Sequence, residues 1–118
     1  MVRKLKNYGE KSSIACQLPD KQKRDRYLYL INDYFRSLRQ FGELFDGFYF
    51  EFPSNDEWIN KVIEFVKFER KCCPFIKFEI IFKPNDGSIR INLRGSKNTK
   101  EYLKAWVPKR LFNRQLDT

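Results

Sequence analysis

Two adjacent cysteines, Cys72 and Cys73, have the clearest capacity for chemistry in this sequence. Glu69 lies three residues before them, and a third cysteine, Cys16, lies near the start of the chain. Thiolates bind soft ions, so the three cysteines could hold Hg(II), As(III) or Cu(I), and they could hold zinc if Glu69 supplied a fourth ligand. The same thiols could instead form a redox pair, or they could be small buried hydrophobic side chains that happen to be neighbours.

The sequence contains no histidine, which removes the usual general base and the commonest metal ligand. A cysteine nucleophile would have only Glu69 as a nearby base, and a carboxylate is a weak substitute. Neither a phosphate-binding loop nor a pair of catalytic carboxylates is recognisable in the sequence. An enzyme is therefore less expected than a binding protein.

The segments around the cysteines resemble those of a known family. They are residues 14–18 (IACQL), 46–53 (DGFYFEFP) and 69–75 (ERKCCPF). On these residues the chain resembles a family of small uncharacterised prokaryotic proteins with a Glu-Arg-x-Cys-Cys-Pro-Phe motif, often encoded near metal- or mercury-responsive genes. The family's Gly-Pro-x-Gly turn is replaced here by residues 95–98 (GSKN). The resemblance implies a thiol site and leaves its purpose open.

The composition predicts one small domain with an aromatic core. The chain has 118 residues, with twelve Phe, six Tyr and two Trp, which is enough to bury roughly two thirds of the unfolded surface. We expect a basic lead-in over residues 1–11, a folded core over 12–107 and a basic tail over 108–118. No segment has the roughly 18 apolar residues of a membrane span or the apolar core of a signal peptide. We therefore expect a cytoplasmic protein whose three cysteines stay reduced.

The charge of the chain is strongly basic, with 24 Lys and Arg against 15 Asp and Glu. The first predicted helix gathers Lys21, Lys23, Arg24 and Arg26 within about one and a half turns. Such a cluster could bind nucleic acid or an acidic protein, although a solvated helix face explains it more simply. No known nucleic-acid-binding motif accompanies the cluster. The sequence leaves the oligomeric state open.

Periodicity and turn residues predict the elements that position these side chains. Apolar residues at spacings of three and four predict helices over 21–38, 58–72 and 98–106, and alternation predicts strands over 12–17, 40–45, 48–52, 77–83 and 88–94. Asp46 and Gly47 are typical of a type I′ hairpin turn, and Ser54 with Glu57 has the form of a capping box. Pro74 should end the second helix at about the two cysteines.

The order strand, helix, strand, strand, helix, strand is that of the ferredoxin-like, split βαβ arrangement. We therefore predict an α+β fold in which an antiparallel-rich sheet carries two main helices on one face, with an extra strand and a short C-terminal helix. Whether Cys16 approaches Cys72 and Cys73 depends on the strand register, which the sequence does not determine.

Overall fold

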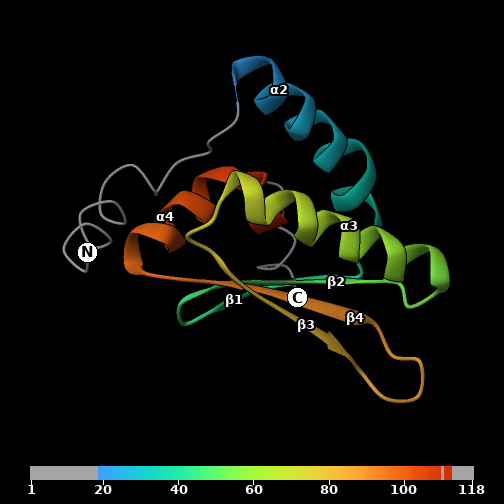
Figure 1. Ribbon diagram of the computed structural model, residues 1–118. Coiled ribbons are helices and arrows are strands. Elements are labelled where there is room, and N and C mark those ends of the chain that lie inside the picture. Colours follow the sequence, from blue (N-terminus) through green and yellow to red (C-terminus); the bar gives the residue numbers. More distant parts are fainter. Residues whose placement is uncertain (1–18, 110, 113–118) are drawn as a thin grey trace, which may run out of the picture.

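The computed structural model describes residues 19–109 and 111–112 (Figure 1). The elements in chain order are α2 (Asp20–Tyr29), the π-helical turn η1 (Leu30–Tyr34), the 3-10 turn η2 (Phe35–Ser37), β1 (Gln40–Leu44), β2 (Gly47–Phe52), α3 (Asp56–Cys72), β3 (Lys77–Phe82), β4 (Ile89–Arg94) and α4 (Lys97–Trp106). The predicted α+β class is confirmed. The predicted strand over 12–17 lies outside the described residues, as do the lead-in and the last six residues of the tail.

The sheet has four strands in the order β1-β2-β4-β3, and every neighbouring pair is antiparallel. Because β2 and β3 both pair with β4, they run in the same direction, and α3 makes the connection between them. Figure 1 shows α2, α3 and α4 on the same face of the sheet. The core therefore lies between this face and the helices.

The helix-facing side of the two central strands forms the floor of the core. Successive strand residues point to opposite faces, so alternate residues of β2 and β4 share this side. All six are at most 3% exposed: Phe48, Phe50, Phe52, Ile89, Ile91 and Leu93. Trp58 of α3 packs on this floor, with its ring stacked on Phe52 at 5.1 Å between centroids.

The first hairpin differs from the predicted type I′ turn at Asp46 and Gly47. Leu44 pairs with Gly47, so the two loop residues are Phe45 and Asp46, and no described glycine has a positive φ. Gly47 lies inside β2, where an added Cβ would come within 1.8 Å of the Leu93 carbonyl oxygen. Glycine is therefore needed at position 47 for close approach of two strands, and not for the turn.

The second hairpin has the left-handed pair that was predicted for the first. Asn85 and Asp86 have φ values of 59° and 56°, and the Gly87 N–H donates to the Pro84 carbonyl at 3.2 Å. Two central residues with positive φ are the mark of a type I′ turn. Short polar side chains tolerate this region better than other non-glycine residues do.

The first predicted helix, over 21–38, is three helical segments in succession. α2 ends at Tyr29, and the chain then widens into the π turn η1 and tightens into the 3-10 turn η2 before Leu38 becomes extended. Such single π turns are rare and interrupt the regular hydrogen-bond ladder. The Tyr34 hydroxyl at this turn donates to the Lys61 carbonyl of α3 at 2.8 Å, which joins the two helical segments.

The start of α3 is capped one residue later than the capping-box pattern predicts. The Asn55 side chain accepts a hydrogen bond from the Trp58 N–H at 2.9 Å, which satisfies one of the unpaired donors of the first turn. Ser54 instead donates to the Asp86 carbonyl of the second hairpin at 2.7 Å. The two side chains thus fix both the beginning of α3 and its position beside the β3–β4 turn.

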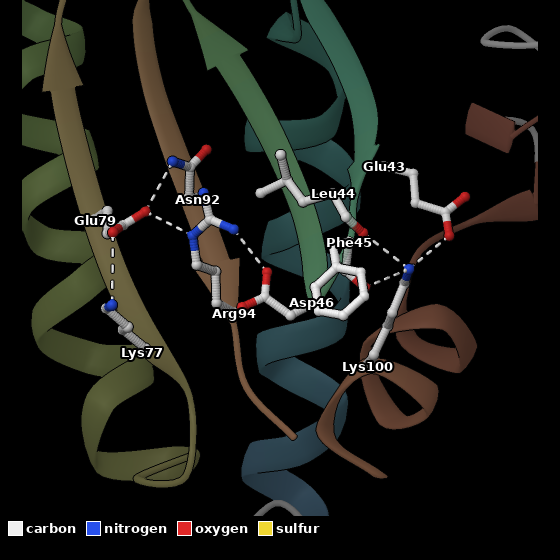
Figure 2. A network of polar contacts seen from close by, with 9 residues as sticks. All are labelled: Glu43, Leu44, Phe45, Asp46, Lys77, Glu79, Asn92, Arg94 and Lys100. Carbon is white, nitrogen blue, oxygen red and sulfur yellow. Dashed lines mark hydrogen bonds and ion pairs between the residues drawn. The ribbon is translucent and has the colours of Figure 1, made fainter. Parts of the chain in front are cut away.

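The sheet face opposite the helices carries polar networks. Glu79 of β3 accepts hydrogen bonds from Asn92 and Arg94 of β4 at 2.9 and 2.8 Å, and Arg94 also reaches Asp46 at 2.6 Å (Figure 2). Glu51 of β2 accepts from the side chain of Arg90 at 2.8 Å. Charged pairs across neighbouring strands stabilise this face.

Candidate thiol and metal site

The last turn of α3 positions Glu69, Cys72 and Cys73. Spacings of three and four place all three side chains on one face of the helix end. Cys73 is the C-cap residue, and its N–H donates to the Glu69 carbonyl at 2.7 Å. Pro74 follows and does not continue the helix. The predicted end of this helix at the cysteines is confirmed.

The three side chains converge within the protein. The Cys72 and Cys73 sulfurs are 3.4 Å apart, and both residues are 0% exposed. One carboxylate oxygen of Glu69 and the two sulfurs all lie within 4.8 Å of one another. A single ion at the centre of this triangle could therefore contact two sulfurs and one oxygen.

Arg26 of α2 completes the site with a bidentate ion pair to Glu69. Its Nε donates to the two carboxylate oxygens at 3.1 and 2.9 Å, and its Nη2 donates to Oε1 at 2.7 Å. The same Nη2 lies 4.0 Å from the Cys73 sulfur. Arg26 is 6% exposed and Glu69 is 1% exposed, so both charges are removed from water. A buried pair of this kind requires good geometry to offset its desolvation, and the bidentate arrangement provides it.

Tyr102 of α4 contacts the Cys73 sulfur. Its hydroxyl oxygen is 3.4 Å from the Cys73 sulfur, and its ring meets the Phe75 ring edge to face at 5.3 Å. Aromatic pairs favour this geometry. Three elements therefore surround the sulfurs, namely α2 through Arg26, α3, and α4 through Tyr102.

The surroundings shift the pKa values of the site in different directions. The pKa of the Cys73 thiol is lowered, first by its hydrogen bond with Cys72 and then, against the opposing effect of burial, by Tyr102 and by the charge of Arg26. Burial by itself lowers the pKa of Arg26, but the hydrogen bonds and charge of Glu69 outweigh burial and raise it. Burial and the hydrogen bond to Cys73 raise the pKa of Tyr102. Near neutral pH, Arg26 is thus a cation and Tyr102 a neutral hydroxyl.

The structure brings together three of the four thiol-site residues predicted from the sequence. Glu69, Cys72 and Cys73 meet as described, whereas Cys16 lies outside the described residues. Sequence reasoning missed the part that Arg26 and Tyr102 play. A signal for Arg26 was present, because it lies four residues before the buried Leu30 and so on the core-facing side of its helix.

The basic cluster of α2 is less uniform than the sequence suggests. Lys21, Lys23 and Arg24 are exposed, and two of them form pairs within the helix, Lys21 with Asp25 at 3.4 Å and Lys23 with Asp20 at 3.8 Å. Arg26 departs from these three because its guanidinium is buried against Glu69. Its predicted place on an exposed nucleic-acid-binding face therefore does not fit its burial.

No helix within the described residues is long and apolar enough to cross a lipid bilayer. Comparison of the chain with protein-family models, curated proteins and solved structures found no match.

Proposed function

We propose that Glu69, Cys72 and Cys73 bind a soft metal or metalloid ion. The observation that carries this proposal is the convergence of two sulfurs and a carboxylate oxygen within 4.8 Å inside the protein. Thiolates select soft and borderline ions, and all three donors come from one helical turn. Because the thiols must lose their protons to become ligands, binding should release protons.

The separation of the sulfurs favours an ion with bent coordination. Two bonds of about 2.3 Å place their sulfurs about 3.8 Å apart at a tetrahedral angle and about 4.6 Å apart at a linear angle. The observed 3.4 Å between Cys72 and Cys73 is close to the bent value. As(III), which is pyramidal, and zinc, which is tetrahedral, therefore suit the pair better than Hg(II) or Cu(I) in linear coordination.

The polar surroundings argue against two cysteines that merely fill the core. Cysteines that only pack would be expected among apolar neighbours, yet Cys73 contacts the Tyr102 hydroxyl and lies near the Arg26 guanidinium. Replacing a buried ion pair by apolar residues is often neutral or stabilising, so the Arg26–Glu69 pair is not explained by stability alone. A cation bound by thiolates would balance the negative charge that deprotonation creates.

The thiol-redox alternative is less well supported. A disulfide joins α-carbons that are usually 4.4 to 6.8 Å apart, whereas neighbouring residues have α-carbons about 3.8 Å apart. A bond between Cys72 and Cys73 would therefore be strained. The nucleic-acid alternative is not favoured either, since two of the three exposed cations of α2 are paired with carboxylates of the same helix.

We also propose a reducing compartment for the protein and a further strand in its sheet. A reducing compartment such as the cytoplasm would keep the cysteines available as ligands. The ferredoxin-like order of strands and helices along the chain, with a fifth strand over 12–17, also remains our proposal. Both edges of β2 and β4 are already paired, so a fifth strand would have to join an outer edge of the sheet. Consecutive strands are usually neighbours, so we place it beside β1, the next strand along the chain.

Titration of the reduced protein with sodium arsenite, and separately with zinc chloride, tests the proposal. We expect one ion per chain, release of protons, and a melting temperature that rises with ion concentration. Cys72→Ser/Cys73→Ser should remove all three effects and keep the circular dichroism spectrum of the wild type. Cys16→Ser, measured in parallel, shows whether the third cysteine contributes.

The packing explanation expects the opposite outcome. The wild type would then bind neither ion with a defined stoichiometry. The double serine variant would lose about 1 to 3 kcal/mol of unfolding free energy, because two hydroxyls would replace two sulfurs in the core. That pair of results would show that the proposed function is wrong.

A further inference from the structure

The strand β3 is a hydrophobic edge of the sheet. It lies at the border of the order β1-β2-β4-β3, so only one of its sides pairs with a strand among the described residues (Figure 1). Ile81 and Phe82 are 42% and 55% exposed. Unpaired N–H and C=O groups along such an edge are a template for a further strand, and proteins normally cover or charge them.

The opposite border of the sheet is covered at one end by contacts from the C-terminal part of the chain. Lys100 of α4 donates to the Leu44 and Phe45 carbonyls at 2.8 and 3.2 Å, and it forms an ion pair with Glu43 at 2.6 Å (Figure 2). The Phe112 ring also packs edge to face on Phe41 of β1. Among the described residues the two borders thus differ, and β3 is the less covered one.

A groove runs beside this open edge, between β3 and the second half of α3. Its volume is about 610 Å³, within the range of small-molecule sites. Apolar side chains contributed by α3, by β3 and by the segment between them line it together with cations of the last turns of α3. The residues that matter here are Ile63, Val66, Ile76, Ile80, Arg70 and Lys71.

The cations of the groove determine the charge of what can bind there. Arg70 and Lys71 are exposed, and neither takes part in an ion pair within the described part of the chain. They follow Lys67, whose nearest carboxylate is Glu64 on the same helix at 3.8 Å. An apolar groove with unpaired cations at one end matches a ligand with apolar side chains and carboxylates.

We propose that this groove binds an extended acidic segment of a partner protein, which adds to the outer edge of β3 as a further strand. Main-chain hydrogen bonds to β3 supply affinity in this mode, and alternate side chains supply specificity. One set of side chains would pack against Ile63 and Ile80 of the groove. Carboxylates of the segment would pair with Arg70 and Lys71.

Charge disfavours occupation of the groove by this chain itself. Residues 1–11 contain four basic side chains, Arg3, Lys4, Lys6 and Lys11, against the single acid Glu10. Residues 12–17 carry no charge and so offer no carboxylate to the cations of the groove, and residues 113–118 carry one arginine and one aspartate. A second copy of the protein carries a formal charge of +9 and would meet the same cations. Like charges in contact suppress association, so a different, acidic chain is the better match.

The proposal can be tested with a fluorescein-labelled peptide of alternating glutamate and valine and the full-length protein. Fluorescence anisotropy should show saturable binding that weakens with added salt. A peptide of alternating lysine and valine should not bind, and proline replacements in the acidic peptide should abolish binding because proline cannot donate to a strand ladder. Arg70→Gln/Lys71→Gln should weaken binding about three- to tenfold.

A matched control removes the same charge elsewhere. Arg24→Gln/Lys104→Gln replaces two exposed cations of α2 and α4 and should leave peptide affinity unchanged. Equal losses in the two double variants, or equal binding of the lysine peptide, would overturn the proposal by showing only non-specific attraction. Amide hydrogen exchange gives an independent criterion, since the peptide should slow exchange in β3. If exchange in β3 is already as slow as in β4 without peptide, another segment of this chain covers the edge. If the protein self-associates and Arg70→Gln/Lys71→Gln abolishes the self-association, a second copy covers it. Either result would also overturn the proposal.

Discussion

Arg26 and Glu69 hold each other inside the protein although 43 positions separate them in the sequence. Each would be a buried charge without its partner, and removing one member of such a pair typically costs about 3 to 5 kcal/mol. The pair also holds the Glu69 carboxylate beside the two sulfurs. The ion pair therefore contributes both to the stability of the protein and to the position of the Glu69 carboxylate.

Single and double substitutions should separate these energies. We expect Arg26→Met and Glu69→Leu each to lower the unfolding free energy by about 3 kcal/mol or more, because each leaves one buried charge. The double variant should lose clearly less than the sum of the two, because no unpaired charge remains. Urea unfolding of the four proteins measures this. Additive losses would show that the two residues do not act as a pair.

The candidate site could be predicted from the sequence only where its residues are local. Glu69, Cys72 and Cys73 share one turn, and Pro74 reveals where that turn ends. Arg26 was grouped with the neighbouring cations of its helix because the sequence shows which residues are adjacent along the chain and not which are in contact in the fold. Tyr102 reaches Cys73 from 29 positions away, and periodicity carries no information about such a contact.

At the scale of elements, the two hairpins show that a dipeptide typical of a turn can be present for another structural reason. Asp46-Gly47 matches the strongest sequence signal for a type I′ turn, yet Gly47 serves the close approach of β2 to β4. The left-handed turn forms instead at Asn85 and Asp86. A local pattern identified the presence of a hairpin correctly, but not the residue pair at its turn.

A glycine pair provides a test of this explanation. Gly47→Ala should lower the unfolding free energy by about 3 kcal/mol or more, because the new methyl group would collide with the Leu93 carbonyl. Gly87→Ala places its methyl group 3.0 Å from the Lys83 side chain in the second hairpin loop and should cost less than about 1 kcal/mol. Thermal unfolding of both variants, compared with the wild type, measures these two losses. Similar losses at the two positions would count against the close-approach explanation.

Most element types follow from the sequence, and the exceptions have physical reasons. Alternation predicts β3 and β4 to within a residue at each end, because one side of each strand faces the core. The π turn at Leu30–Tyr34 is not predicted, since apolar residues recur at nearly the same spacing in an α-helix and in a π turn. Strand order is not predicted either, because it depends on contacts between distant segments.

At the scale of the whole molecule, carboxylates offset part of a large positive charge. Glu51 is buried on the sheet face opposite the helices and accepts hydrogen bonds from Lys83, Ser88 and Arg90. Burial by itself raises the pKa of Glu51, but the hydrogen bonds and the charge of Lys83 outweigh burial and lower the pKa from its usual value. Protonation of this carboxylate would leave two cations without their partner in a molecule that is already at +9.

The stability of the protein should therefore depend on pH through Glu51. A folded-state pKa below that of the unfolded chain gives stability that is fully present above about pH 4.5 and is lost as the pH falls through the folded-state pKa. We expect Glu51→Gln to be less stable than the wild type at pH 7, with a difference that shrinks in acid. Unfolding free energies measured from pH 7 to pH 3 follow this. A difference that does not change with pH would rule out ionisation of Glu51 as its cause.

The candidate ligands and the residues that enclose them come from different parts of the chain. Glu69, Cys72 and Cys73 belong to one helical turn, whereas Arg26 and Tyr102 arrive from α2 and α4. In engineering terms, the donor set is portable: copying one turn onto the end of another exposed helix would transfer all three donor atoms. The enclosure is not portable, because it depends on two further elements. A transplanted turn would therefore be open to any thiol-seeking reagent, and selectivity would have to be rebuilt by the new scaffold.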